Sequence, residues 1–384
     1  RGMCGKRAFM DLFENFILFD HSGPTAAKIL ARNHQYLGVN EAVASYVNRD
    51  IREGKLGVFW HTQGSGKSYS MVFLARKIKR KFAGSPTFLV VTDREELNKQ
   101  IAATFAGCGC MPATDASAYI AKSGADLAQR LKGNPSFVFT LIQKFNDARA
   151  EPIHTDHDVI IFCDEAHRTN SGKLHEAVRQ LMPGATLIGF TGTPLLKKDK
   201  KTTLEVFGPY IHTYKFNEGV ADGVVLDLRY EARDIDQDLS SEAKIDQWFE
   251  AKTAGLTQTA KDKLKASWST LNKLYSSKER LQKIVNDIIF DMQTKPRLQR
   301  ERSTAMLVAG SIYQACRYWE LFQMAGFKRC AVVTSYEPTD ASVRTSTSDP
   351  DQESEDEYKK RIYERMLGGQ TVKDFEDEAK RLFK

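Results

Sequence analysis

The sequence predicts an α/β protein with a parallel β-sheet that is covered by helices on both faces. Short apolar segments alternate with segments of helical periodicity between residues 56 and 190, and this alternation is typical of such sheets. Polar stretches follow three of the apolar segments, at 62–68, 164–168 and 191–194. Ligands bind parallel sheets at the carboxyl ends of the strands, so the three stretches are candidates for one site.

The elements of this first region follow from apolar periodicity and from the residues that begin and end helices. The strands are predicted at 56–61, 87–92, 137–141, 158–167 and 186–194, and the helices at 67–82, 93–105 and 172–181. The first helix places Met71, Leu74, Ile78 and Phe82 on one face, as a helix that packs on a sheet requires. Asp93 is the predicted N-cap of the second helix.

The pattern changes after about residue 222. The sequence there predicts strands at 224–233, 305–311 and 330–336, a polar helical region at 240–300 and a helix at 312–324. We interpret this part as a helical insertion followed by the start of a second α/β domain, of which two or three strands are present. The expected domains are therefore residues 1–222 and residues 223–384.

The composition is that of a globular protein, with 41% hydrophobic and 27% charged residues in a chain of 384. The sequence has no run of eighteen apolar residues, so neither a membrane span nor a membrane partner is expected. The N-terminal residues lack the pattern of a secretory signal. The six cysteines lack the spacing of a zinc site, which predicts reduced thiols and a cytoplasmic protein.

The charge of the chain favours a polyanionic partner only mildly, because the net charge is +7. Basic residues cluster at 76–81 and 197–201, and an acidic segment rich in Ser and Thr lies at 345–357. We interpret all three clusters as solvated surface, which is the usual setting of charged runs.

The stretch 62–68 resembles a phosphate-binding loop, whose pattern is Gly-x-x-x-x-Gly-Lys-Ser/Thr. Gly66, Lys67 and Ser68 fit this pattern, but His61 occupies the position of the first glycine. The backbone can still curl its N–H groups around an anion, so that Lys67 reaches the β- and γ-phosphates and Ser68 reaches Mg²⁺. The predicted nucleotide-binding residues are Thr62, Gln63, Gly64, Ser65, Gly66, Lys67 and Ser68. A plain Gly/Ser turn before a helix is the alternative.

Asp164 and Glu165 directly follow the apolar segment 159–163. A magnesium nucleotide site needs an acid at the end of a second strand. Asp164 suits a water-mediated contact to Mg²⁺, and Glu165 is placed to orient and deprotonate an attacking water. Lys67, Asp164 and Glu165 are therefore the candidate catalytic residues, and Ser68 and Asp164 the candidate Mg²⁺ ligands, of an ATP site. An ordinary loop that begins with two acids is the alternative.

Together these stretches resemble the motif series of superfamily 2 helicases and translocases, namely Gly-Lys-Ser, Asp-Glu-Ala-His (the DEAH box) and Thr-Gly-Thr-Pro. More closely, the chain resembles the restriction subunit of type I restriction–modification enzymes over nearly its whole length. The segments that carry this resemblance are 28–43, 59–68, 88–101, 140–145, 161–168, 190–195, 208–233 and 304–322. A histidine at the position of His61 is usual in that family, so this departure from the general pattern supports the resemblance.

The resemblance implies roles for further residues. Gln35 matches a glutamine that recognises adenine, and a surface glutamine is the alternative. Thr191, Gly192 and Thr193 match the motif that couples hydrolysis to movement, and a tight turn before Pro194 is compatible with that role.

The same resemblance implies DNA contacts and partners. Thr92, Arg94 and Thr140 lie in segments that track the DNA backbone in such motors, where hydroxyls and arginines hold phosphates without reading sequence. The family implies a RecA-like first motor domain, a partial second one, and ATP- and Mg²⁺-dependent translocation of double-stranded DNA. The implied enzyme is the motor part of a type I site-specific deoxyribonuclease, with modification (methyltransferase) and specificity subunits as partners.

Two parts of that machinery find no match in the sequence. The family's nuclease domain precedes the motor, whereas here the motor begins near Gln35, and the motifs with the arginine finger would follow those near Ser311. We therefore expect the isolated chain to turn over little ATP. The open alternatives are another superfamily 2 helicase or remodelling ATPase, a module that binds nucleotide or partner subunits without turnover, and a P-loop kinase, which the DEAH box disfavours.

Overall fold

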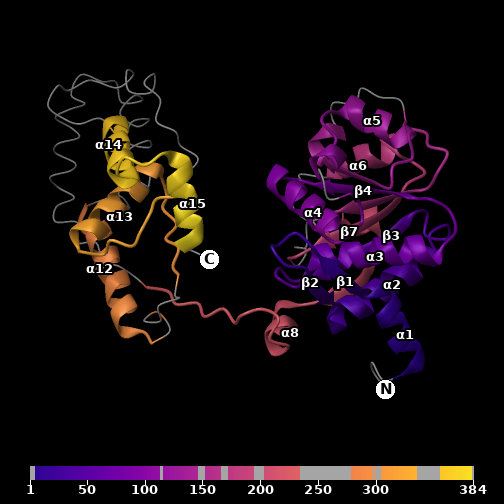
Figure 1. Cartoon of the computed structure of the whole chain (residues 1–384), viewed down its shortest axis with the longest axis horizontal. Coiled ribbons are helices and arrows are strands. Elements are labelled where there is room, and N and C mark those ends of the chain that lie inside the picture. Colours follow the sequence, from indigo (N-terminus) through magenta and orange to yellow (C-terminus); the bar gives the residue numbers. More distant parts are fainter. Residues whose placement is uncertain are drawn as a thin grey trace, which may run out of the picture. The chain divides into compact units, whose positions relative to one another are not determined.

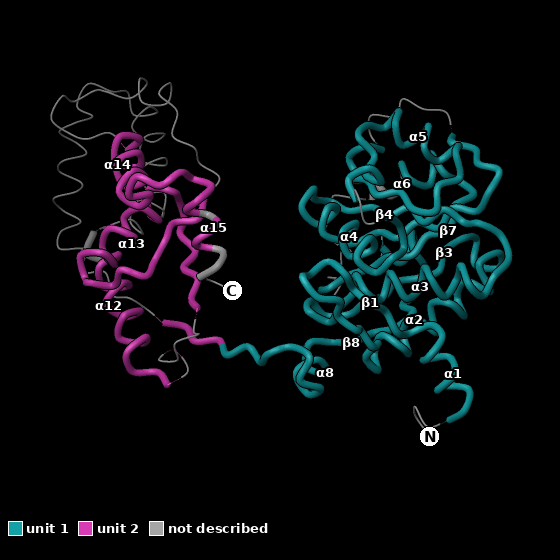
Figure 2. The backbone as a smooth tube through the Cα atoms, viewed as in Figure 1, with its two compact units in different colours: residues 1–229 teal, residues 230–384 magenta. Residues whose placement is uncertain are grey.

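The chain forms two compact units, Arg1–Arg229 and Tyr230–Lys384, which are coloured separately in Figure 2. The computed structural model describes residues 5–112, 116–145, 152–165, 172–193, 203–233, 278–296, 298, 304–334 and 355–382. The domain boundary predicted at residue 222 stays a prediction. Unit 1 contains a β-sheet, whereas the described part of unit 2 is helical.

Unit 1 is built on a six-stranded sheet in the order β5-β4-β6-β7-β3-β8. Figure 1 labels β3, β4 and β7 of this sheet. All neighbouring strands are parallel. The strands are β3 (Lys55–His61), β4 (Thr87–Thr92), β5 (Phe137–Leu141), β6 (Val159–Cys163), β7 (Thr186–Thr191) and β8 (Tyr210–Tyr214). Every residue of β4, β6 and β7 is buried, as expected for strands covered on both faces. The predicted parallel sheet is confirmed, and β8 is an edge strand that the sequence analysis did not predict.

Helices cover both faces of this sheet because successive strand residues point to opposite sides. On one face, Phe88 and Phe162 belong to a core that includes side chains of α2, α3 and α4. On the other face, Leu89 and Ile161 belong to a second core with side chains of α5 and α6. The helices are α2 (Asn33–Val47), α3 (Lys67–Lys81), α4 (Glu95–Gly107), α5 (Gly124–Lys132) and α6 (Gly172–Leu181).

A buried ion pair fixes the N-terminal helix to this layer. Lys77 of α3 has a side chain that is 1% exposed, and its ammonium donates to Asp11 of α1 and to Asn40 of α2. A buried lysine is stable in this position only because acceptors surround it. Within the described residues, unit 1 also contains α1 (Lys6–Asn15), β1 (Ile17–Asp20), β2 (Ala27–Leu30), α8 (Phe216–Ala221) and the 3₁₀ helices η1 (Ala116–Tyr119) and η2 (Ile142–Phe145), and residues 203–207 are helical.

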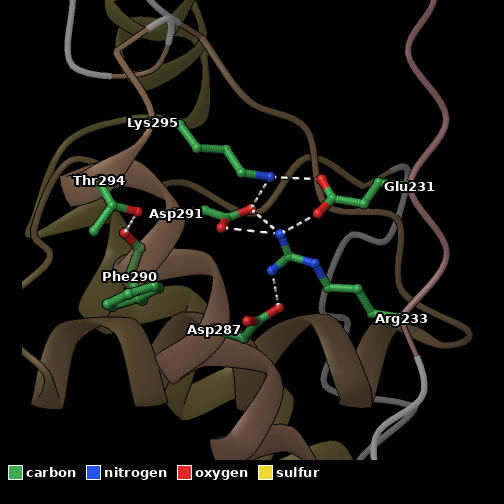
Figure 3. A network of polar contacts seen from close by, with 7 residues as sticks. All are labelled: Glu231, Arg233, Asp287, Phe290, Asp291, Thr294 and Lys295. Atoms are coloured by element: carbon green, nitrogen blue, oxygen red, sulfur yellow. Dashed lines mark hydrogen bonds and ion pairs between the residues drawn. The ribbon is translucent and has the colours of Figure 1, made fainter.

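Unit 2 consists of helices where the structure describes it, namely α12 (Lys278–Thr294), α13 (Ile312–Met324), α14 (Glu355–Leu367) and α15 (Val372–Leu382). Leu281 and Val285 of α12 pack against Tyr318 and Phe322 of α13. The first residues of unit 2 are held to α12 by a network of charged side chains (Figure 3). In this network Arg233 contacts Glu231, Asp287 and Asp291, and Lys295 contacts Glu231 and Asp291.

Three strand predictions in the second half of the chain are wrong. Residues 224–233, 304–311 and 330–334 are described, and none of them is in a strand. A strand exists only when a neighbouring strand accepts and donates its backbone hydrogen bonds, and the described residues of unit 2 supply no such neighbour. Residues 335–336 lie outside the described residues, and so do residues 240–277 of the helical region predicted at 240–300.

The predicted start of α4 also needs correction. The helix begins at Glu95 and its N-cap is Arg94, without a side-chain cap. Asp93 instead forms an ion pair with Arg94, with 3.7 Å between Oδ2 and Nε. The prediction placed the cap too early because an Asp before a helical pattern is a common capping signal. In the part of the chain that the structure describes, no helix has both the length and the apolar character to cross a bilayer.

Candidate nucleotide-binding site

The candidate phosphate loop connects the end of β3 to the start of α3. Gly64 and Gly66 have φ angles of 81° and 85°, a left-handed conformation that favours glycine. A Cβ on Gly66 would lie 2.8 Å from Nε2 of Gln35, so a side chain would not fit there. No side chain caps the N-terminus of α3, and its first turn contains no acidic residue. The loop therefore presents a curled backbone and an uncapped helix end, a combination that binds anions.

Lys67 brings the three predicted polar stretches together. Its ammonium donates to the carbonyl oxygen of His61 at 3.3 Å. A Cβ placed on Gly192 would lie 2.9 Å from the same nitrogen, so the turn after β7 lies against Lys67. Burial lowers the pKa of Lys67, while the charges of Asp164 and Glu165 oppose that shift. The loops after β3, β6 and β7 thus meet at one edge of the sheet, as the sequence predicts.

Asp164 and Glu165 directly follow β6, in an environment that is unfavourable for two ionised carboxylates. Burial, followed by the charge of Glu165, raises the pKa of Asp164 to about 6, and Lys67 opposes this shift. Within the described residues, Oδ1 of Asp164 is buried without a hydrogen-bond partner. Glu165 has a φ of 51°, a strained conformation for a residue other than glycine. Shifted pKa values and local strain are both enriched at functional sites.

These residues fit a magnesium–nucleotide complex better than a metal site made of protein alone. The described residues contain no group of three or more His, Cys, Asp or Glu side chains that would hold a metal ion. Mg²⁺ in nucleotide sites needs only one or two protein oxygens, with phosphates and waters completing its shell. The unpartnered Oδ1 of Asp164 and the hydroxyl of Ser68, next to Lys67 in α3, match that requirement.

Gln35 lies in the first turn of α2 and holds the phosphate loop. The residue is 4% exposed, so it is not a surface glutamine. Its Nε2 donates to the carbonyl oxygen of Gly66 at 2.9 Å, and its Oε1 accepts from the backbone N–H of Arg32 at 2.9 Å. Adenine recognition by Gln35 stays a prediction.

The residues predicted for coupling form a local turn. Thr191 is fully buried, and its hydroxyl bonds with the backbone of Thr193. Three predicted features lie outside the described residues, namely Pro194, the last two residues of the DEAH box (166–167) and the lysines at 197–201.

The residues predicted to contact DNA differ strongly in their exposure. Thr92 is 1% exposed and Thr140 is fully buried, and their hydroxyls bond with the carbonyls of Arg94 and Leu141. The side chain of Arg94 is 56% exposed. All three DNA contacts stay predictions, and the burial of both hydroxyls favours Arg94 among them.

The sequence analysis missed the ring cluster behind the phosphate loop. His34, His212 and Tyr214 gather around His61, from elements far apart in the sequence. Only His61 was singled out, because it breaks a spacing rule. The one available signal for His34 was its position immediately before Gln35.

Comparison with known proteins shows the family to which the chain belongs. A family model for the SWI2/SNF2 ATPase matches residues 34–262. The type I restriction enzyme HindI endonuclease subunit of Haemophilus influenzae is 34% identical over 335 residues, which cover 81% of this chain and 30% of that protein. A Methanocaldococcus jannaschii protein named as the type I restriction endonuclease subunit MjaIXP is 32% identical over 320 residues, covering 80% and 29%.

Among solved structures, the UvsW helicase from bacteriophage T4 is 18% identical, with a TM-score of 0.37, over 54% of this chain and 67% of that chain. At this score the structural likeness does not bear on function. The chain spans less than a third of the length of the two restriction subunits. The matched family model covers more than half of the chain. The chain therefore belongs to the SWI2/SNF2 ATPase family and is a homologue of the endonuclease subunits of type I restriction enzymes.

Proposed function

We propose that this chain binds and hydrolyses ATP as the motor part of a type I restriction enzyme that translocates double-stranded DNA. The observation that carries the proposal is the convergence at Lys67. The phosphate loop, the Asp164–Glu165 pair and the turn at Gly192 meet there, at the carboxyl edge of adjacent strands. This is the set of groups that phosphoryl transfer needs, namely an anion cradle, a cation and acids for Mg²⁺ and water.

Each group has a chemical task in this proposal. The backbone of 62–66 and the N-terminus of α3 hold the phosphates, and Lys67 neutralises the charge on the β- and γ-phosphates. Ser68 and Asp164 hold Mg²⁺, which supplies charge neutralisation to the phosphates when bound. Glu165 orients the attacking water and accepts its proton. A cation next to Asp164 lowers the pKa of that carboxyl, so we expect the acid to ionise fully on binding Mg²⁺.

The proposed partners follow from the relatives. The restriction subunits to which the chain is similar are named as endonuclease subunits, and the chain aligns with less than a third of their length. We therefore assign to this chain duplex DNA movement, with the exposed Arg94 as a backbone contact, and docking to modification and specificity subunits. Cleavage belongs to a nuclease domain outside the matched region.

The main alternative is a module that binds nucleotide, or partner subunits, without turnover. A second alternative is another superfamily 2 helicase or remodelling ATPase, which would share the same nucleotide site. A strand-displacement assay tests the helicase alternative, because a translocase of duplex DNA does not separate the strands.

The proposal is tested by Glu165→Gln in the full-length subunit, with ATP affinity and turnover measured with Mg²⁺ and duplex DNA. The variant keeps the carbonyl oxygen but loses the base, so affinity should stay within about twofold while turnover falls by about 10²-fold or more. Loss of ATP affinity would contradict the role of Glu165. An unmeasurable turnover in the wild type, with ATP bound tightly, would favour the module without turnover.

A further inference from the structure

His61, which replaces a glycine of the general phosphate-loop pattern, forms a buried link to the edge strand. Its side chain is fully buried at the end of β3. Its Nε2 shares a hydrogen bond of 2.8 Å with Nδ1 of His212 in β8. The carbonyl oxygen of the same residue accepts the bond from Lys67. One residue thus connects the phosphate-binding lysine, through its backbone, to β8, through its ring.

His34 holds the middle of the loop. Its Nε2 lies 2.9 Å from the carbonyl oxygen of Ser65. A carbonyl only accepts, so this ring nitrogen carries the proton. The ring stacks on Tyr214, with 3.9 Å between centroids and 9° between planes. The next residue, Gln35, donates to the carbonyl oxygen of Gly66. Two consecutive residues of α2 therefore hold two consecutive carbonyls of the phosphate loop.

The segment after β8 completes the enclosure of the loop. The backbone carbonyl of Tyr214 accepts from the N–H of Thr62 at 2.9 Å. The hydroxyl of Tyr214 donates to Asp222 at 2.8 Å, just after α8. A Cβ on Gly64 would lie 3.1 Å from Cγ1 of Val225. Residues from 212 to 225 thus contact both the rings and the loop itself.

We propose that His34, His61, His212 and Tyr214 are positioning residues that hold the phosphate loop in its curled, anion-binding form. His34 contacts the loop at the carbonyl of Ser65, and the backbone carbonyl of Tyr214 accepts from the N–H of Thr62. The ring of His61, the residue whose carbonyl accepts from Lys67, is held by His212. Their effect on nucleotide affinity rests on the proposed function. If the rings only filled core space, their hydrogen bonds would not matter and any ring of similar size would serve.

The change in affinity for ligands with different numbers of phosphates distinguishes positioning of the loop from simple filling of the core. His34→Phe keeps a ring to stack on Tyr214 but removes the donor to Ser65. His34→Gln keeps a donor at similar reach but removes the ring. The matched control is His157→Phe, because His157 bonds with Thr87 Oγ1 at 2.9 Å, at the amino end of β4. All variants are measured in the full 384-residue chain, with the melting temperature as a check of folding.

A phosphate-loop effect should grow with the number of phosphates on the ligand. In His34→Phe we expect the affinities for ATP and ADP to fall about tenfold, the loss typical of one buried hydrogen bond, with AMP changed less than twofold. His34→Gln and His157→Phe should bind ATP as the wild type does. An equal loss for ATP and AMP, or wild-type affinity in His34→Phe, would overturn the proposal.

Hydrogen exchange of the nucleotide-free chain gives a second readout that does not depend on binding. The amides of residues 62–66 should exchange faster in His34→Phe than in the wild type or in His157→Phe. Unchanged exchange in this loop would overturn the positioning role. Faster exchange in a chain that binds no nucleotide would support the positioning role and contradict the proposed function, so the two can fail separately.

Discussion

The two units treat apolar, extended segments in opposite ways. In unit 1, β6 runs through the middle of the sheet and all five of its residues are buried. In unit 2, the segment 304–309 is also largely apolar in sequence, but Met306 is 90% exposed and Val308 is 83% exposed. Val333 in the segment 330–334 is 91% exposed. An apolar run thus becomes a strand only where a neighbouring strand satisfies its backbone.

Helices do not show this contrast. The helices predicted at 172–181 in unit 1 and 312–324 in unit 2 both have the predicted bounds. The backbone hydrogen bonds of a helix join residues four apart, so the local sequence largely determines whether the helix forms. The backbone hydrogen bonds of these strands join segments that are distant in sequence, so whether such a strand forms depends on the rest of the chain.

Removing a core side chain of unit 1 should have the largest effect. Phe162 is fully buried, with ring centroids 5.5 Å from both Phe88 and Phe190. Phe162→Ala should destabilise unit 1 by about 3–5 kcal/mol, through lost burial and a cavity. The free energy of opening is measured by hydrogen exchange, which reads each unit separately. The matched change in unit 2 is Val308→Ala, which should alter stability by less than about 0.5 kcal/mol. A cost of several kcal/mol for Val308→Ala would show that its segment is buried in a strand after all.

Acid should destabilise unit 1 through its buried histidines. Burial and the nearby charges of His212, His34 and Lys67 lower the pKa of His61 to about 2, against 6.5 for an exposed histidine. Between these values the unfolded chain binds a proton that the folded chain does not. Stability therefore falls as the pH drops below about 6.5, by up to about 1.4 kcal/mol per pH unit for this residue.

The raised pKa of Asp164, about 6, acts in the opposite direction. This carboxyl binds a proton in the folded chain before the unfolded chain does, so it favours the folded state as the pH falls below about 6. The test therefore compares how the free energy of unfolding depends on pH in the wild type and in His61→Phe. The slope between pH 6.5 and about 5 should be shallower in the variant. Equal slopes would mean that His61 titrates normally in the folded chain.

The charged network of unit 2 should give the smallest effect. Arg233 lies on the surface, where ion pairs are screened by salt. Arg233→Ala should lower the melting temperature of unit 2 slightly at low ionic strength and not at all in about 1 M salt. A loss that salt does not change would mean that the network (Figure 3) holds the start of unit 2 by packing rather than by charge.

The part of the site that lies at the carboxyl ends of the strands could be predicted from the sequence. Lys67, Asp164 and Gly192 each follow an apolar run, and parallel strands bring such ends to one edge. The groups that hold the loop from behind were not predictable in this way. His34 meets Ser65, and His61 meets His212, across long stretches of sequence, with no spacing rule to connect them. The sequence likewise did not predict that the hydroxyls of Thr92 and Thr140 are buried, because threonine is common both inside and outside sheets.

The most direct test of the central claim is the affinity for ATP and Mg²⁺ of the wild type and of Lys67→Ala, measured by isothermal titration calorimetry. Lys67 is the residue on which the three loops converge, and removal of its charge should weaken ATP binding by at least about tenfold, which is 1.4 kcal/mol. The melting temperature of the nucleotide-free variant should change little. Lys67 is half-buried, so its charge is desolvated at a cost in free energy, and the substitution removes that cost together with the contacts of the side chain. Binding of ATP with equal affinity by both proteins would contradict the account.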